Sequence, residues 1–155
     1  MRLALYQPEI PQNTGTLMRL GACLGVPLDV IEPCGFVWND QKLRRAGMDY
    51  IELANVTRHV SWVKFWQATQ ATGSRIVLLD AQAKQSFVTF KFQPTDILLL
   101  GQESSGVPET VATQVDAQVL IPMLSGCRSL NVAVSAAMVL TEALRQTNQF
   151  PTGDL

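Results

Sequence analysis

Two glycine-containing loops in the last third of the chain carry small and polar residues that could bind a ligand. Gly101–Pro108 follows the apolar run Ile97–Leu100, and Ser125–Asn131 follows the apolar run Val119–Met123. Short, continuous apolar runs are typical of strands buried on both faces of a parallel sheet. Loops that leave such strands meet at one edge of the sheet, where small residues leave backbone amides free for a ligand. The pattern therefore predicts a ligand pocket between these two loops.

The residues around the glycines argue against three common kinds of site. A phosphate-binding P-loop needs Lys and then Ser or Thr after its last glycine, whereas Val107 and Pro108 follow Gly106. The nucleophile elbow of an α/β hydrolase needs glycine two residues before its serine, and Gln102 stands there before Ser104. No G-x-G-x-x-G sequence follows a predicted strand, so an ordinary dinucleotide or Rossmann-type methyl-donor site is not expected. Either loop taken alone would more simply be a structural turn.

Polar residues near the start of the chain form a further candidate group. Leu3–Tyr6 predicts a strand, and Asn13 lies at its turn into a helix whose apolar stripe runs to Leu24. Asn13 could cap that helix and do nothing more. Arg19 lies about two turns into the helix, where an arginine is more often an exposed cation than a functional residue.

Basic side chains gather in the next segment, although the net charge of the chain is only −1. The group consists of Lys42, Arg44, Arg45, Arg58 and His59. The first three lie on a predicted short helix, Asp40–Ala46, and the last two follow a predicted strand, Tyr50–Leu53. Aromatic residues nearby could stack on bases, so the group could be an RNA-binding surface. A solvated cationic face is an equally good interpretation.

Length and composition limit the classes of protein. A chain of 155 residues, 47% hydrophobic and 16% charged, is most simply one globular domain with a sizeable core. No apolar stretch approaches the roughly 18 residues of a membrane span, and no signal peptide is evident. The three cysteines lack the spacing of metal ligands and there is one histidine, which predicts reduced thiols in the cytoplasm and no zinc site.

The remaining pattern predicts an α/β fold with a parallel sheet. Further strands are expected at Leu28–Ile31 and Ile76–Leu79, and a helix capped by Ser61 is expected to run to Ala71. The segment from Asp80 to Pro94 is expected to be mostly loop. The last predicted helix, Val132–Arg145, is apolar on nearly all sides, so we expect a second subunit to cover one of its faces in a homodimer.

Three motifs, taken in this order, resemble the SPOUT class of RNA methyltransferases. They are Asn13–Arg19, Gly101–Pro108, and Ile121–Met123 with Ser129–Val132. The opening Pro8–Gly15 and the segment Leu43–Tyr50 are similar to the small single-domain members that methylate the ribose of the wobble nucleotide of leucine tRNA. The resemblance extends over essentially the whole chain.

This resemblance implies a fold beyond what the pattern alone predicts. It implies one domain over residues 1–155, a three-layer α/β/α arrangement, and a trefoil knot at the C-terminal end. The knot and the donor-binding region would lie at about residues 76–145. It also implies S-adenosylmethionine as cofactor, no metal, tRNA as partner, and a homodimer through the last helix. Neither a membrane nor DNA is an expected partner, and the expected location is the cytoplasm.

The implied reaction is 2′-O-methylation of nucleotide 34, a cytidine or a modified uridine. By position, the donor pocket would contain Leu79, Gly101, Glu103, Gly106, Ile121, Met123, Ser129 and Leu130. The catalytic group would be Arg19, Asn13, Glu103 and Asn131. Because arginine stays protonated at neutral pH, Arg19 is expected to hold a phosphate and stabilise the developing alkoxide, in its own or the partner's site.

Three other interpretations remain open at this point. The chain could methylate another tRNA or an rRNA, or it could be a non-catalytic dimeric RNA-binding module. An unrelated α/β hydrolase would need Ser104 or Ser129 to react with acyl esters.

Overall fold

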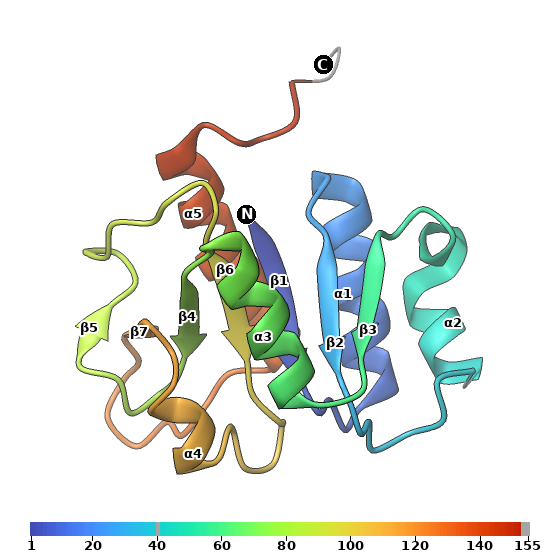
Figure 1. The fold of residues 1–155 in the computed structure, drawn as a ribbon, viewed down its shortest axis with the longest axis horizontal. Helices are drawn as coiled ribbons and strands as arrows, with labels where there is room; N and C mark the ends of the chain where they lie inside the picture. The colour runs from blue at the N-terminus through green and yellow to red at the C-terminus, as the bar shows by residue number, and fades with distance from the viewer. Residues whose placement is uncertain (40, 153–155) are drawn as a thin grey trace.

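The computed structural model describes residues 1–39 and 41–152 and is an α/β fold on one seven-stranded sheet (Figure 1). The strands are β1 (Arg2–Tyr6), β2 (Leu28–Ile31), β3 (Val56–His59), β4 (Ile76–Leu79), β5 (Gln85–Ser86), β6 (Ile97–Leu100) and β7 (Ala117–Leu120). The helices are α1 (Pro11–Leu24), α2 (Gln41–Gly47), the 3₁₀ helix η1 (Met48–Ile51), α3 (Trp62–Thr72), α4 (Glu109–Ala112) and α5 (Val132–Thr147). No helix in these two ranges is long and apolar enough to cross a membrane.

The sheet is parallel throughout, as the apolar runs predict. Its strand order is β3-β2-β1-β6-β4-β7-β5. Leu3 of β1 lies opposite Leu28 of β2 on one side and Leu98 of β6 on the other. The strands β2 and β3 extend the sheet on one side of β1, and β4 to β7, which come later in the chain, extend it on the other side. Such a switch point opens a crevice at the carboxyl ends of the strands.

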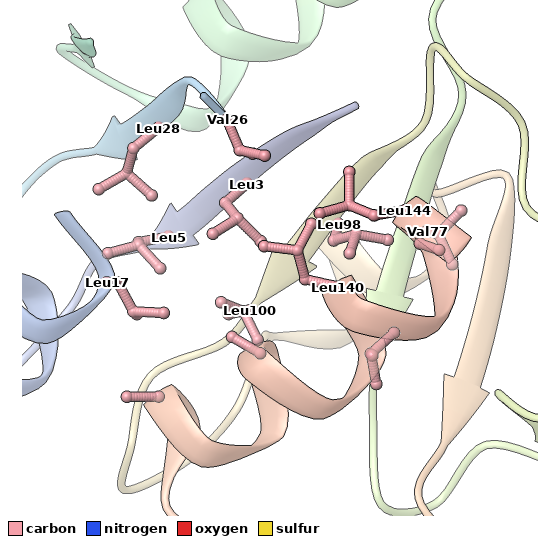
Figure 2. Close-up of a cluster of buried hydrophobic side chains, with 14 of the residues drawn as sticks. Leu3, Leu5, Leu17, Val26, Leu28, Val77, Leu98, Leu100, Leu140 and Leu144 are labelled. Carbon is pink, nitrogen blue, oxygen red and sulfur yellow. The ribbon is translucent and has the colours of Figure 1, made fainter. Parts of the chain in front are cut away.

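Side chains alternate between the two faces of the sheet and form two cores. Leu3 and Leu5 of β1 point toward α1 and α5 and belong to the larger core (Figure 2). Ala4 and Tyr6 belong to the other core, with Phe65 of α3. Helices therefore cover both faces of the sheet, α1, α2 and α5 on one and α3 and α4 on the other (Figure 1).

Helix α1 begins two residues before the predicted cap. Pro11 occupies its first turn, where the fixed φ of proline suits a helix and its missing N–H costs nothing. Ile10 precedes the helix without a side-chain capping bond, so the prediction that Asn13 caps it is wrong. Asn13 instead lies within the first turn, and its side chain is available for other partners.

The predicted strand Tyr50–Leu53 is also wrong. Helix α2 continues into η1, and Ile51 turns inward to pack against the larger core. The strand forms later, at Val56–His59, where Val56 pairs with Leu28 of β2. Arg58 and His59 are therefore part of a strand at the edge of the sheet and do not follow one. The expected start of α2 at Asp40 falls outside the described residues.

The last helix has two different faces in this chain. One face is fully buried and includes Ala136, Val139 and Leu140. The opposite face leaves Val134 49% exposed and Met138 41% exposed. Among the described residues, this chain therefore covers one face of the helix only, and the second subunit expected over the other face stays a prediction.

Candidate functional site

A cavity of about 600 Å³ lies at the carboxyl edge of the sheet. It is bounded by the loops that follow β1, β4, β6 and β7. Its apolar floor includes Leu78, Leu100 and Val119. Leu100 is the last residue of β6, and Leu78 and Val119 are the last but one of β4 and β7. The pocket predicted between the two glycine loops is therefore present, and the loops after β1 and β4 complete it.

All the residues expected to bind the methyl donor line this cavity. They are Leu79, Gly101, Glu103, Gly106, Ile121, Met123, Ser129 and Leu130. Asn13 and Asn131, expected in the catalytic group, line it as well, whereas Arg19 does not. The structure brings these side chains together, and the role of each one stays a prediction.

The carboxylate of Glu103 joins the loop after β6 to the start of α1. Its Oε2 accepts a hydrogen bond from the Glu9 backbone N–H at 2.8 Å. Its Oε1 accepts from the Asn13 side-chain amide at 3.1 Å and from the Ile10 N–H at 3.4 Å. Because a carboxylate is an acceptor only, three converging donors hold this side chain in one position.

Asn13 extends this connection to the loop after β7. The Nδ2 of Asn131 donates to the Oδ1 of Asn13 at 3.0 Å. The Oδ1 of Asn131 accepts from the N–H groups of Ala133 at 2.9 Å and Val134 at 3.3 Å, and so caps α5. We call Glu103, Asn13 and Asn131 the three-residue relay. It ties three loops around the cavity to the first turn of α5.

A second contact between the same loops runs in the opposite direction. Glu9 accepts hydrogen bonds from the Ser104 N–H at 2.9 Å and from the Ser104 hydroxyl at 2.8 Å. Glu9 thus receives two donors from the loop after β6, while its own N–H donates to Glu103 of that loop. These reciprocal hydrogen bonds hold the loop after β6 against the loop after β1.

Glycine is required where this loop closes on itself. Gln102 and Gly106 exchange backbone hydrogen bonds of 2.8 and 2.9 Å. A Cβ atom at Gly101 would lie 2.5 Å from the carbonyl carbon of Gly106, which is too close for any side chain. Gly106 has a φ of +69°, in the left-handed region that favours glycine. The two glycines therefore shape this wall of the cavity.

The loop after β7 offers free hydrogen-bond donors to the cavity. Within the described residues, the backbone N–H groups of Met123, Ser129 and Leu130 donate to no other protein group. Free donors beside an apolar floor suit a ligand that has both a flat apolar part and several acceptor atoms.

Arg19 lies outside this cavity, next to η1. Its guanidinium stands over the Tyr50 ring, 5.1 Å from the centroid, and Nη1 lies 3.1 Å from the Met48 sulfur. Arg44 and Arg45 line a second cavity beside η1, which Met48 also lines. The structure therefore groups Arg19 with part of the predicted basic surface, apart from the expected donor pocket.

Arg58 and His59 both lie close to carboxylates. Arg58 forms an ion pair with Glu32 and stands over the Trp38 ring at 4.8 Å from its centroid. His59 Nε2 lies 2.8 Å from Asp29 Oδ1, and the side chain is 13% exposed. These two residues present less free charge to RNA than the sequence suggests.

Sequence reasoning missed several residues that line the cavity or shape it. Asp80 and Gln82, after β4, line it, and so does Arg128 in the loop after β7. Glu9 shapes it through Ser104. Asp80 could have been predicted from the sequence, because it is the first polar residue after a buried strand, and ligands bind at the carboxyl ends of such strands. Among the described residues, no three His, Cys, Asp or Glu side chains are grouped as metal ligands.

A parallel sheet with a ligand cavity at its switch point defines a class of α/β proteins, and comparison with known proteins gives the family. Residues 1–141 match the model of the SpoU rRNA Methylase family. The chain belongs to this family. A protein of Beijerinckia indica named tRNA (cytidine(34)-2′-O)-methyltransferase is 58% identical over 146 residues, which cover 93% of this chain and 90% of that relative.

Solved structures agree with this assignment. One described as "Structural insights into the 2-OH methylation of C/U34 on tRNA" has a TM-score of 0.89 at 41% identity, and the match covers 94% of both chains. The SpoU methyltransferase AviRb from Streptomyces viridochromogenes, solved in complex with AdoMet, has a TM-score of 0.83 at 28% identity. That match covers 94% of this chain and 57% of AviRb.

Proposed function

We propose that this chain transfers a methyl group from S-adenosylmethionine to the ribose 2′-oxygen of nucleotide 34 in tRNA, a cytidine or modified uridine of leucine isoacceptors. The observation that carries the proposal is the cavity lined by all the expected donor-binding residues, in a chain of the SpoU family. The name of the 58% identical relative and the description of the structural neighbour with a TM-score of 0.89 support nucleotide 34 as the target.

The cavity fits S-adenosylmethionine by its shape and its donors. Its apolar wall, with Leu79, Ile121 and Leu130, suits the flat adenine ring. The free N–H groups of Met123 and Ser129 suit acceptor atoms of the adenine and the methionine carboxylate. When bound, the cofactor supplies a methyl group already activated by its sulfonium. The proposal therefore needs no metal.

The chain's own residues would position the ribose and manage the charge that develops on its oxygen. Glu103 and Asn131 would act by fixing the loops, because Asn13 forms a hydrogen bond with each of them and so joins the two. Arg19 would hold a phosphate and stabilise the alkoxide, since its guanidinium stays protonated and is a poor base. In-line positioning would supply much of the rate.

The location of Arg19 favours a site shared between two subunits. Arg19 follows Asn13 by six residues, a rise of about 9 Å along the helix, and it does not line the cavity of its own chain. We propose that it reaches the cavity of a partner subunit. The exposed face of α5, with Val134 and Met138, and the exposed side chains of Leu124 and Leu130 beside the cavity support a homodimer there.

The resemblance to SPOUT enzymes also concerns the topology of the backbone. We propose one domain with a trefoil knot, formed by the loops after β6 and β7 and by α5. The match of residues 1–141 to the SpoU family model supports it. An experimentally determined backbone trace tests it. A cytoplasmic location agrees with a tRNA substrate and stays a prediction.

The replacement Arg19→Ala tests the reaction. We expect methyl transfer to tRNA to fall about 100-fold or more, because one donor to a developing oxyanion commonly contributes that much. The measurement is transfer of labelled methyl from S-adenosylmethionine to total tRNA of a strain lacking this gene, with alkali resistance of the modified linkage as the sign of 2′-O-methylation. Donor affinity, measured by calorimetry, should stay near that of the unchanged chain.

Thr16→Ala, an exposed change on the same helix, is the matched control and should keep full activity. Full activity of Arg19→Ala would contradict the proposed role, and so would loss of donor binding. Donor binding without any transfer to tRNA by the unchanged chain would favour an rRNA substrate. Absence of both would favour the non-catalytic RNA-binding module.

The double replacement Val134→Glu with Met138→Glu tests the dimer. Two buried carboxylates would strongly oppose association, so we expect the variant to sediment as a monomer and to lose transfer while it keeps its fold. The unchanged chain should sediment at twice the chain mass at micromolar concentration. Val63→Glu places the same charge on an exposed valine of α3, 57% exposed, and should leave the dimer intact. A monomeric unchanged chain would refute the shared site.

The pair Arg44→Glu and Arg45→Glu tests the RNA surface on α2. Arg44 and Arg45 are exposed, and phosphate contacts dominate the affinity of proteins for nucleic acids. We expect the dissociation constant for tRNA to rise about tenfold or more, and the dependence of binding on salt to weaken. Lys64→Glu, on α3 across the sheet, reverses one charge and is compared with the single variants Arg44→Glu and Arg45→Glu. An equal loss in all three single variants would mean that only net charge matters and would reject this surface.

A further inference from the structure

Arg128 is the only cation among the described residues that line the donor cavity. The other charged lining residues are Asp80 and Glu103. Both are already engaged: Asp80 accepts the Gln82 N–H at 2.8 Å, and Glu103 accepts three donors. Arg128 is exposed and forms no hydrogen bond, ion pair or ring contact with any described residue. The cavity thus holds one positive group with no internal partner.

The backbone around Arg128 is fixed on both sides. Before it, Cys127 donates to the carbonyl of Leu124 at 3.1 Å, and Gly126 turns the chain with a φ of +91°. After it, Asn131 is held by Asn13 and caps α5. A long, free side chain therefore projects from an anchored loop. Ordering of Arg128 by a ligand therefore costs side-chain rotamer entropy and desolvation of the guanidinium, with little further cost for the backbone.

The position of Arg128 on the rim decides which anion it meets. The apolar floor of the cavity is formed by strand ends, whereas every residue from Leu124 to Asn131 is exposed. A donor that fills the floor leaves the rim to the incoming polynucleotide. In RNA, the ribose carbon next to the one that carries the 2′-hydroxyl carries the 3′-phosphate. A phosphate must therefore come to the mouth of the cavity together with the reacting oxygen. A guanidinium matches phosphate with two parallel hydrogen bonds.

We propose that Arg128 is a substrate-binding residue that pairs with the phosphate adjoining the methylated ribose, on the same chain that holds the donor. The inference rests on the proposed function. In this proposal two arginines have different roles. Arg128 binds the nucleotide from the chain that holds the donor, and Arg19 reaches the site from the partner subunit. It also explains why a cavity with no free cation other than Arg128 can receive an anionic substrate.

The test compares Arg128→Ala and Arg128→Lys with the unchanged chain. We expect Arg128→Ala to raise the KM and the dissociation constant for tRNA about tenfold to 100-fold, and to reduce the slope of log affinity against log salt by about one. Arg128→Lys should recover the salt slope but only part of the affinity, because an ammonium keeps the charge without the fork. The affinity for S-adenosylmethionine alone should change less than about twofold. Lys64→Ala, which removes one exposed charge from α3, is the control and should change none of these values.

Two results would overturn the proposal. If Arg128→Ala weakens binding of S-adenosylmethionine and leaves tRNA affinity unchanged, the guanidinium holds the donor's carboxylate instead. If neither affinity changes, Arg128 contacts no ligand. Failure of the proposed function looks different, because the unchanged chain would then transfer no methyl group to tRNA. Direct tRNA titration of the Arg128 variants would still decide the role of this residue, since unchanged affinity would reject it.

Discussion

The carboxylate of Glu103 is the group on which the shape of the site depends. It accepts hydrogen bonds from the backbone of the loop after β1 and from Asn13, and Asn13 in turn accepts from Asn131. Hydrogen bonds to a charged group each contribute about 1.5–3 kcal/mol to stability. Three loops that leave three different strands are therefore held in one arrangement. Asn131 also caps α5, so the same connection fixes the helix that we propose as the dimer interface.

This constraint explains how charge is distributed around the cavity. Glu103, which lines the cavity, already accepts three hydrogen bonds from the protein. The expected catalytic arginine, Arg19, lies beside Tyr50 and Met48 rather than in the cavity, and Arg128 alone among the described lining residues is a cation. One chain thus supplies the cavity that we propose for the methyl donor and one cation at its rim. A shared site in a dimer would add the second cation, the basic surface of α2 and a cover for the exposed face of α5.

The sequence alone predicts much of this arrangement, for physical reasons. Buried parallel strands are largely apolar, so β1, β4 and β6 are visible as apolar runs, and so is β2 apart from its buried Asp29. The strand β3 was missed because three of its four residues, Thr57, Arg58 and His59, are polar. Ile51, in the predicted strand, instead belongs to the 3₁₀ helix η1 and packs against the core. The contact between Asn13 and Asn131 joins residues 118 positions apart, which no local pattern can indicate. Glu9 and Arg128 matter only because of how distant loops meet.

The most direct test of the central claim is the affinity of Asn13→Ala for S-adenosylmethionine, measured by calorimetry. This replacement breaks the link to Glu103 and the link to Asn131 at once, and Gln12→Ala changes an exposed neighbour on the same helix as its control. If the relay holds the cavity in shape, the dissociation constant should rise about tenfold, a loss of about 1.4 kcal/mol, while the chain stays folded. An affinity equal to that of the unchanged chain would show that the loops keep their positions without the relay, and would contradict this account.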